Sequence, residues 1–204
     1  MSEVSTTPSP PNNTSAVRPT VGFMLRHPAH LMAMGFGVGL SPKAPGTMGT
    51  LWAWLAFWVM QPWLNNTQLG WLMAISLGLG WWASATTARN LRTTDPGCVV
   101  WDEIAAFWLV LWLIGPASLW VQLIAFVLFR FFDAVKPGPV GWADRLYHDI
   151  DPSTDPNAWM KAGWGIMLDD YVAAACTLLT MLVLLWFLPG GHMDGTHWFG
   201  GMMH

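Results

Sequence analysis

Three long stretches of the chain contain no Asp, Glu, Lys or Arg: residues 44–88, 104–129 and 171–193. A helix needs about 20 apolar residues to cross a bilayer. The first stretch is long enough for two crossings, which the polar turn "QPWLNNTQ" (61–68) would separate, and the third is long enough for one. The pattern therefore indicates a membrane protein made of hydrophobic helices.

The second stretch is interrupted near its middle by "GPAS" (115–118). Gly-Pro is a turn signal, so we expect a hairpin of two short helices, each roughly 26 Å long; one long tilted crossing is the alternative. The predicted fold is all-α: a polytopic integral membrane bundle of about five hydrophobic helices, two hairpins plus a final helix. The expected helices cover about 47–62, 68–90, 98–115, 117–134 and 168–188.

Composition supports this interpretation. Only 10% of the 204 residues are charged and 53% are hydrophobic, whereas about a quarter of a soluble domain is charged. The net charge of −3 gives no reason to expect a nucleic-acid partner. Cys98 and Cys176 both lie in apolar segments and are expected to be packing residues, not a disulfide.

The ends of the chain differ from its middle. Residues 1–20 are rich in Ser, Thr, Pro and Asn and lack an apolar signal segment, so a disordered N-terminal arm is expected. Residues 21–189 are predicted to form the membrane-embedded domain, and residues 190–204 a flexible C-terminal tail.

The basic residues predict the orientation. With two hairpins and a final helix, all nine fall on one side of the membrane, and the two opposite turns carry no charge. Because Lys and Arg favour the cytoplasmic side, this side is expected to face the cytoplasm. The nine are Arg18, Arg26, Lys43, Arg89, Arg92, Arg130, Lys136, Arg145 and Lys161.

The same side collects five carboxylates. They are expected in the first turn of the third helix, at the end of the fourth and at the start of the fifth: Asp102, Glu103, Asp133, Asp169 and Asp170. Acidic residues favour helix N-termini by about 0.3–1 kcal/mol, which would account for Asp102, Glu103 and Asp169 without any function. It does not account for Asp133, at a helix C-terminus, and ionisable residues at a membrane edge are candidates for function.

Arg130 and Lys136 accompany these acids. Five carboxylates and two cations leave an excess of about three negative charges, which cannot all persist close together without compensation. Divalent cations would supply it, and an all-oxygen ligand set suits Mg²⁺, Mn²⁺ or Ca²⁺. No His or Cys lies among the acids, which argues against zinc. Carboxylate-held Mg²⁺ with Arg and Lys nearby is typical of sites that handle phosphate.

Two further segments fit phosphate chemistry. In "FRFFDAVKP", Arg130, Asp133 and Lys136 recur every third residue and would share a helix face, and Pro137 disfavours helical geometry at Lys136. The Gly- and Pro-rich stretch "GFGVGLSPKAPGTMGT" (35–50) precedes the first helix and ends in Thr50, a residue suited to the N-cap position. Such a loop can bind phosphate through backbone N–H groups, and Gly46 and Thr47 are its candidate positions.

Four blocks together resemble the bacterial phosphatidylglycerophosphatase A family: "GFGVGLSPKAPGTMGT", "VVWDEIAAFW", "FRFFDAVKPGPVGWADR" and "GWGIMLDDYVAA". The resemblance covers roughly residues 31–185. It implies an integral enzyme of the bacterial inner membrane, multi-pass and Mg²⁺-dependent, with its active site on the cytoplasmic side. It also implies a reaction, removal of the terminal phosphate of phosphatidylglycerophosphate to give phosphatidylglycerol.

By the same resemblance, Asp102, Glu103, Asp133, Asp169 and Asp170 are the catalytic and metal-binding positions, and Arg130 and Lys136 accompany them. Two departures concern packing beside the site. Ala105-Ala106 and Ala162-Gly163-Trp164 stand where the family often has glycines.

Two other functions fit the residues. A divalent-cation channel or transporter can place an acidic cluster between helices, although these acids are expected at one membrane edge. A membrane scaffold could use the acids only to cap helices. Release of inorganic phosphate from a lipid phosphate distinguishes all three.

Overall fold

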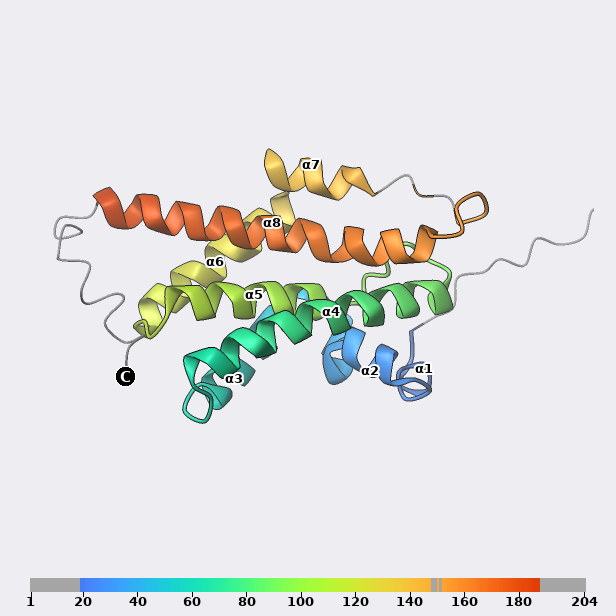
Figure 1. The fold of residues 1–204 in the computed structure, drawn as a ribbon, viewed down its shortest axis with the longest axis horizontal. Helices are drawn as coiled ribbons and strands as arrows, with labels where there is room; N and C mark the ends of the chain where they lie inside the picture. Colours follow the sequence, from blue (N-terminus) through green and yellow to red (C-terminus); the bar gives the residue numbers. More distant parts are fainter. Residues whose placement is uncertain (1–18, 148–149, 151, 188–204) are drawn as a thin grey trace, which may run out of the picture.

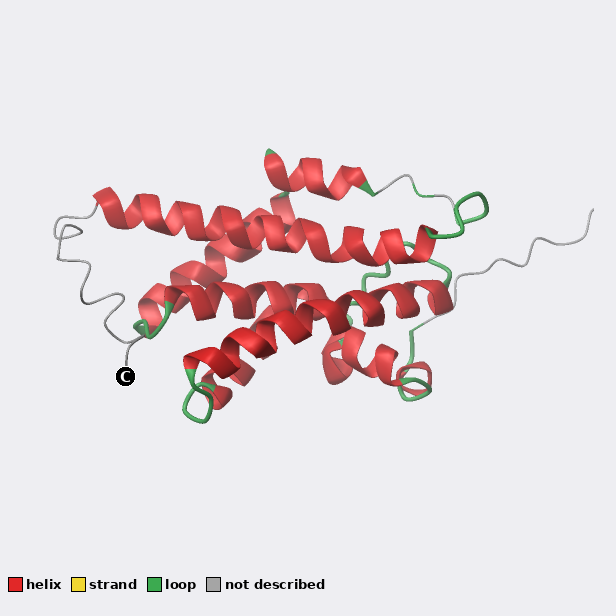
Figure 2. Ribbon diagram, in the orientation of Figure 1, coloured by secondary structure: helices red, strands yellow, loops and turns green. Residues whose placement is uncertain are grey.

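The computed structural model describes residues 19–147, 150 and 152–187. Every regular element in these residues is a helix (Figure 2), which confirms the all-α prediction. The predicted C-terminal tail and all but the last two residues of the predicted N-terminal arm lie outside the described residues.

The helices follow one another along the chain with short connections (Figure 1). Two short helices and a 3-10 segment come first, and α3 to α6 then match the first four predicted helices closely. The elements are α1 (Val21–Met24), α2 (Pro28–Ala33), η1 (Gly35–Leu40), α3 (Pro45–Met60), α4 (Asn66–Leu91), α5 (Trp101–Ile114), α6 (Leu119–Val135), α7 (Pro139–Leu146) and α8 (Ala158–Phe187).

Local sequence explains both predicted turns. Asn65 and Gln68 form a reciprocal capping box that starts α4 directly after the "QPWLNN" turn. Gly115, with φ of 67°, ends α5 in a conformation that favours glycine. Ser118 then caps α6 by accepting a hydrogen bond from the Val121 N–H.

α5 lies at the centre of the bundle. It packs against α3, α4 and α8, while α8 also packs against α4, α6 and α7. Figure 1 shows α5 running between α4 and α8. The side chains of Ile104, Phe107, Val110 and Leu111 on α5 are buried almost completely. The first turn of α5 is therefore held from several sides.

The final helix begins earlier than predicted. α8 starts at Ala158, not near residue 168, so Asp169 and Asp170 lie about three turns inside it. Close packing explains the extension. A Cβ at Gly163 would lie 2.7 Å from the Ala85 Cβ of α4, and one at Gly165 would lie 2.8 Å from the Tyr147 Cβ. The two glycines let α8 approach its neighbours, and this packing outweighs the low helix propensity of glycine.

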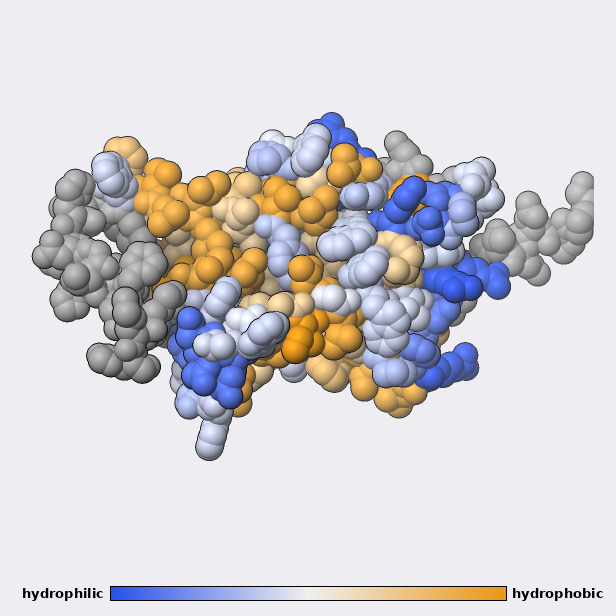
Figure 3. Space-filling view, viewed as in Figure 1, coloured by the Kyte–Doolittle hydropathy of each residue, from blue (hydrophilic) through white to orange (hydrophobic). Residues whose placement is uncertain are grey.

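Large apolar side chains remain exposed on the outer faces of α3, α4, α6 and α8. In Figure 3 they form a continuous surface over the C-terminal half of α8 and the helices beside it. Examples are Leu55, Trp58, Trp71, Ile75, Trp120, Val127, Leu179 and Phe187.

One helical segment in the described part of the chain, Ala158–Leu184, is long and apolar enough to cross a membrane. α3, α5 and α6 have 16, 14 and 17 residues, fewer than the roughly 20 that a full crossing needs. The positions of the helices thus agree with the sequence, whereas five crossings remain a prediction.

Candidate metal and phosphate site

All five predicted carboxylates line one cavity of about 220 Å³. α5 contributes Asp102 and Glu103 from its first turn, α6 contributes Asp133 from its last turn, and α8 contributes Asp169 and Asp170. The loop before α5 and the short helix α7 complete the wall. Residues far apart in the sequence are therefore brought to one place, as the hairpin prediction required.

Asp102, Glu103 and Asp170 form the tightest group. One carboxylate oxygen from each lies within 4.8 Å of the others. Asp102 and Asp170 are buried, and Asp102 Oδ1 and Glu103 Oε2 are buried without a hydrogen-bond partner. Oxygen ligands on opposite sides of Mg²⁺ lie about 4.2 Å apart. The donor set and its unpartnered oxygens therefore fit a divalent cation.

Asp133 is neutralised by Arg130. The two residues are three apart on α6 and form an ion pair, as the shared helix face predicted. Arg130 Nη1 also lies 3.9 Å from Glu103 Oε1 and donates a hydrogen bond to the Thr50 hydroxyl of α3. Arg130 thus links α6 to α5 and α3 beside the carboxylate group.

Lys136 bridges two other carboxylates. Its Nζ donates hydrogen bonds to Asp169 Oδ2 at 2.6 Å and to Asp144 Oδ1 at 2.5 Å. Lys136 ends α6 with φ of 49°, followed by Pro137, so the predicted departure from the helix at this residue is confirmed. Burial disfavours the ammonium, but the bonds to Asp144 and Asp169 outweigh it and raise the pKa of Lys136 above its ordinary value.

The bridge leaves part of Asp169 free. Its Oδ1 is buried and has no hydrogen-bond partner, and the residue lines the cavity. Lys136 therefore fixes the orientation of Asp169 through one oxygen while the other remains available for a ligand.

Asp144 was not singled out from the sequence. It lies on α7, which packs against α8, and the turn at Gly138, with φ of 53°, directs α7 back over the site. The signal was its place in the block "FRFFDAVKPGPVGWADR", but the spacing of eight residues from Lys136 does not itself predict a contact.

The N-terminus of α3 touches the site through Gly46. A Cβ on Gly46 would lie 2.1 Å from Glu103 Oε1 and 3.3 Å from Arg130 Nη1, so no larger residue fits without displacing them. Thr47 follows in the same turn. Neither residue lines the cavity, and Gly46 is connected to it through its close approach to Glu103.

Thr50 differs from the expectation that it would be the N-cap. Ala44 is the N-cap of α3 and Thr50 lies inside the helix. The Thr50 hydroxyl is buried and donates to the Gly46 carbonyl. Pro45, which favours the first helical position, explains the earlier start.

The two cysteines are free, as predicted. Cys98 is buried in the connection before α5 and Cys176 lies within α8. Neither one lines the cavity.

Comparison with known proteins supports the resemblance carried by the four sequence blocks that meet at this site. Residues 31–185 match the model of the family described as phosphatidylglycerophosphatase A. The chain belongs to this family. The match contains every predicted site residue and covers the same range as the resemblance of the four sequence blocks.

Individual relatives agree. Phosphatidylglycerophosphatase A of Escherichia coli is 34% identical over 175 residues, which cover 85% of this chain and 87% of the relative. The protein of the same name from Haemophilus influenzae is 31% identical over 170 residues, 83% of this chain and 96% of the relative. A relative from Bacteroides thetaiotaomicron is named as a candidate phosphatidylinositol-3-phosphatase. It is 32% identical over 166 residues, which cover 78% of this chain and 94% of the relative. No solved structure is a significant match.

These names bear on the alternatives. All three relatives are named as phosphatases, and nothing in the comparisons supports a cation channel or transporter. The difference between the two kinds of name concerns the lipid headgroup, not the class of reaction.

Proposed function

We propose that the chain is a Mg²⁺-dependent lipid phosphatase. It hydrolyses the terminal phosphate of phosphatidylglycerophosphate and releases phosphatidylglycerol and inorganic phosphate. The observation that carries this proposal is the group of Asp102, Glu103 and Asp170, whose oxygens lie within 4.8 Å of one another beside Lys136 in one cavity. Family membership supplies the substrate class.

Asp102, Glu103 and Asp170 are the residues that would hold Mg²⁺. Asp102 Oδ1 and Glu103 Oε2 are buried and unpartnered, so both carboxylates have capacity for a ligand, and one oxygen of Asp170 lies within 4.8 Å of an oxygen of each. When bound, the ion would offset the charge of the substrate phosphate and lower the pKa of a water molecule. These carboxylates would hold the ion beside the start of α5, where Trp101 and Ile104 are buried.

The remaining site residues divide the other tasks. Asp169, with its free Oδ1 held at the cavity by Lys136, is placed to accept a proton from the attacking water. Arg130 and Lys136 stabilise negative charge on the phosphoryl oxygens. Gly46 and Thr47, at the start of α3, do not line the cavity, and Gly46 acts on the site through its close approach to Glu103.

The exposed apolar surface supports a membrane setting. Exposed Trp and Leu side chains on α3, α4, α6 and α8 suit an apolar environment, and the charge-free stretches of sequence underlie these helices. We place the protein in the bacterial inner membrane as a multi-pass protein, with the cavity on the cytoplasmic side. The acyl chains of the lipid remain in the bilayer against these apolar faces.

The activity is tested with the purified chain in lipid vesicles. Inorganic phosphate should be released from phosphatidylglycerophosphate, the release should stop in EDTA, and added Mg²⁺ should restore it. Phosphatidylinositol-3-phosphate serves as the comparison substrate. Failure to release phosphate from either lipid with Mg²⁺ present would overturn the proposal, and cation flux across the vesicles without hydrolysis would favour a channel.

Topology needs a separate test. Cysteines introduced at exposed Asn65 and Asn157, with Cys98 and Cys176 replaced by Ser, should react with an impermeant reagent from opposite sides. Asn157 should react only from the cytoplasm. Labelling of both from one side contradicts the arrangement of two hairpins and a final helix.

A further inference from the structure

Seven carboxylates line the cavity, and five of them fall into two groups that differ in their counter-charge; Asp95 and Asp133 belong to neither group. Asp102, Glu103 and Asp170 form the group that can share one ion. Asp144 and Asp169 instead share the ammonium of Lys136, at 2.5 and 2.6 Å. Both groups line the same cavity, and Asp169 and Asp170 are neighbours in α8. The Lys136 ammonium thus stands between two carboxylates as a bridging metal ion would.

We propose that Lys136 takes the place of a second metal ion, so that the chain binds one divalent cation, at Asp102, Glu103 and Asp170. This inference rests on the proposed phosphatase function and adds the number of ions to it. Asp144 becomes a positioning residue, which acts on the reaction only through Lys136.

Charge and geometry both support a single ion. A second divalent cation near Asp144 and Asp169 would be repelled by the ammonium, and at these contact distances each carboxylate already has an oxygen bonded to it. Asp133 is paired with Arg130. Within the described residues, Asp102, Glu103 and Asp170 are the only group that meets the spacing for a metal ion.

The same geometry gives Lys136 a role toward substrate. An ammonium has three N–H donors, and two are used by Asp144 and Asp169. The third is left for an oxygen in the cavity, such as one of the phosphoryl group. A metal ion in a two-metal site would hold the same group from this side.

The test counts ions with Mn²⁺ as the probe on the purified full-length chain. The wild-type protein should bind one Mn²⁺ per chain and give an electron paramagnetic resonance spectrum without coupling between ions. Lys136→Met frees Asp144 and Asp169, so it should bind two ions with spin-coupled signals. Lys136→Met combined with Asp144→Asn should return to one ion, because the second site has lost a ligand.

Lys161→Met is the matched control. Lys161 forms a pair of the same kind with Asp155, at 2.5 Å, but neither residue lines the cavity, so the count should stay at one. Circular dichroism and size-exclusion chromatography verify that each variant is folded.

Every outcome of the ion count either supports or overturns the inference. Two coupled ions in the wild-type protein, or one ion in folded Lys136→Met, would overturn it. The proposed function would still hold in either case if the protein releases phosphate. If Lys136→Met does not fold, the wild-type count alone decides. Absence of bound Mn²⁺ together with absence of phosphate release overturns the proposed function itself.

Discussion

α5 and α8 each present two adjacent carboxylates to the cavity, but from different parts of the helix. Asp102 and Glu103 lie in the first turn of α5, where the helix dipole favours an anion by about 0.3–1 kcal/mol. Asp169 and Asp170 lie about three turns inside α8, where the dipole contributes little. Asp169 is compensated by Lys136, whereas Asp170 forms no ion pair within the described residues.

The difference bears on the scaffold alternative. Capping can account for acids in the first turn of α5, but it cannot account for two acids inside α8. A buried carboxylate without a counter-charge destabilises the fold, so Asp170 must be either protonated or offset by a bound cation, which the proposed metal site would supply.

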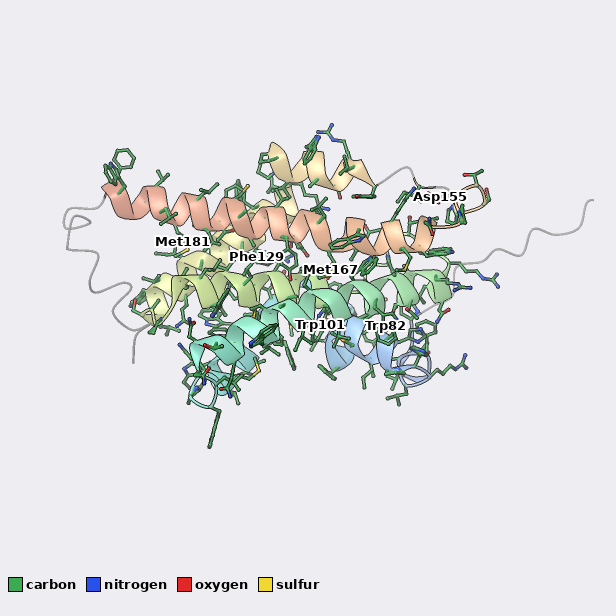
Figure 4. The ribbon with its side chains drawn as sticks, viewed as in Figure 1. Trp82, Trp101, Phe129, Asp155, Met167 and Met181 are labelled. Carbon is green, nitrogen blue, oxygen red and sulfur yellow. The ribbon has the colours of Figure 1, made fainter. Side chains whose placement is uncertain are left out.

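Asp170→Asn should have the largest effect. The substitution keeps the shape of the side chain but removes a proposed metal ligand, so phosphate release should fall by at least about 1,000-fold, roughly 4 kcal/mol of transition-state stabilisation. Mn²⁺ binding should be lost in parallel. Asp155→Asn is the control, because Asp155 lies in the loop before α8, away from Trp101 and Met167 at the middle of the bundle (Figure 4). Near-normal turnover in Asp170→Asn would return the α8 acids to a structural role.

Gly46→Ala tests the α5 side of the contrast. The new Cβ would lie 2.1 Å from Glu103 Oε1, so Glu103 or the start of α3 must move. Because small displacements in a site are costly, kcat/KM should fall by about 100-fold. Gly78→Ala in α4 is the matched control, because a Cβ there meets nothing within 4 Å. If both variants keep full activity, the contact between α3 and Glu103 has no role in catalysis.

Lys136→Arg should have a smaller effect on the α8 side. Arginine keeps the charge, but its planar guanidinium does not reproduce a compact ammonium held between two carboxylates. We expect kcat/KM to fall about tenfold, roughly 1.4 kcal/mol, without rescue by added Mg²⁺. Lys161→Arg, at the other lysine that bonds a nearby aspartate, should be neutral. Full activity in Lys136→Arg would show that Lys136 needs only a long cationic side chain and would leave Arg130 as the remaining candidate for binding the phosphate.

The sequence predicted the parts of this site that depend on local signals. Polar turns and charge gaps predicted the helices, and the order of the helices predicted that Asp102, Asp133 and Asp170 would lie together, as they do in the cavity. The start of α8 was predicted too late, because the close packing of Gly163 against Ala85 and of Gly165 against Tyr147, which supports the extra turns, is not visible in the sequence. The division of the carboxylates was also not predictable, because the Asp144 contact depends on how α7 folds over α8.

The smallest effect concerns the stability of the metal-free protein. In EDTA, Asp102→Asn and Asp170→Asn should both raise the melting temperature, because each removes a carboxylate from a crowded acidic group. Asp170→Asn should stabilise the protein more, by about 0.3–1 kcal/mol, because the carboxylate of Asp102 is favoured by the dipole of the α5 N-terminus and that of Asp170 is not.

With saturating Mg²⁺ the sign of the stability change should reverse, since the wild-type protein gains the binding energy of the ion and the variants do not. Thermal unfolding followed by circular dichroism, with and without Mg²⁺, measures both differences. Equal stabilisation by the two variants in EDTA would show that the dipole of α5 does not distinguish the two carboxylates, and destabilisation by both would show that they are already compensated without a metal ion.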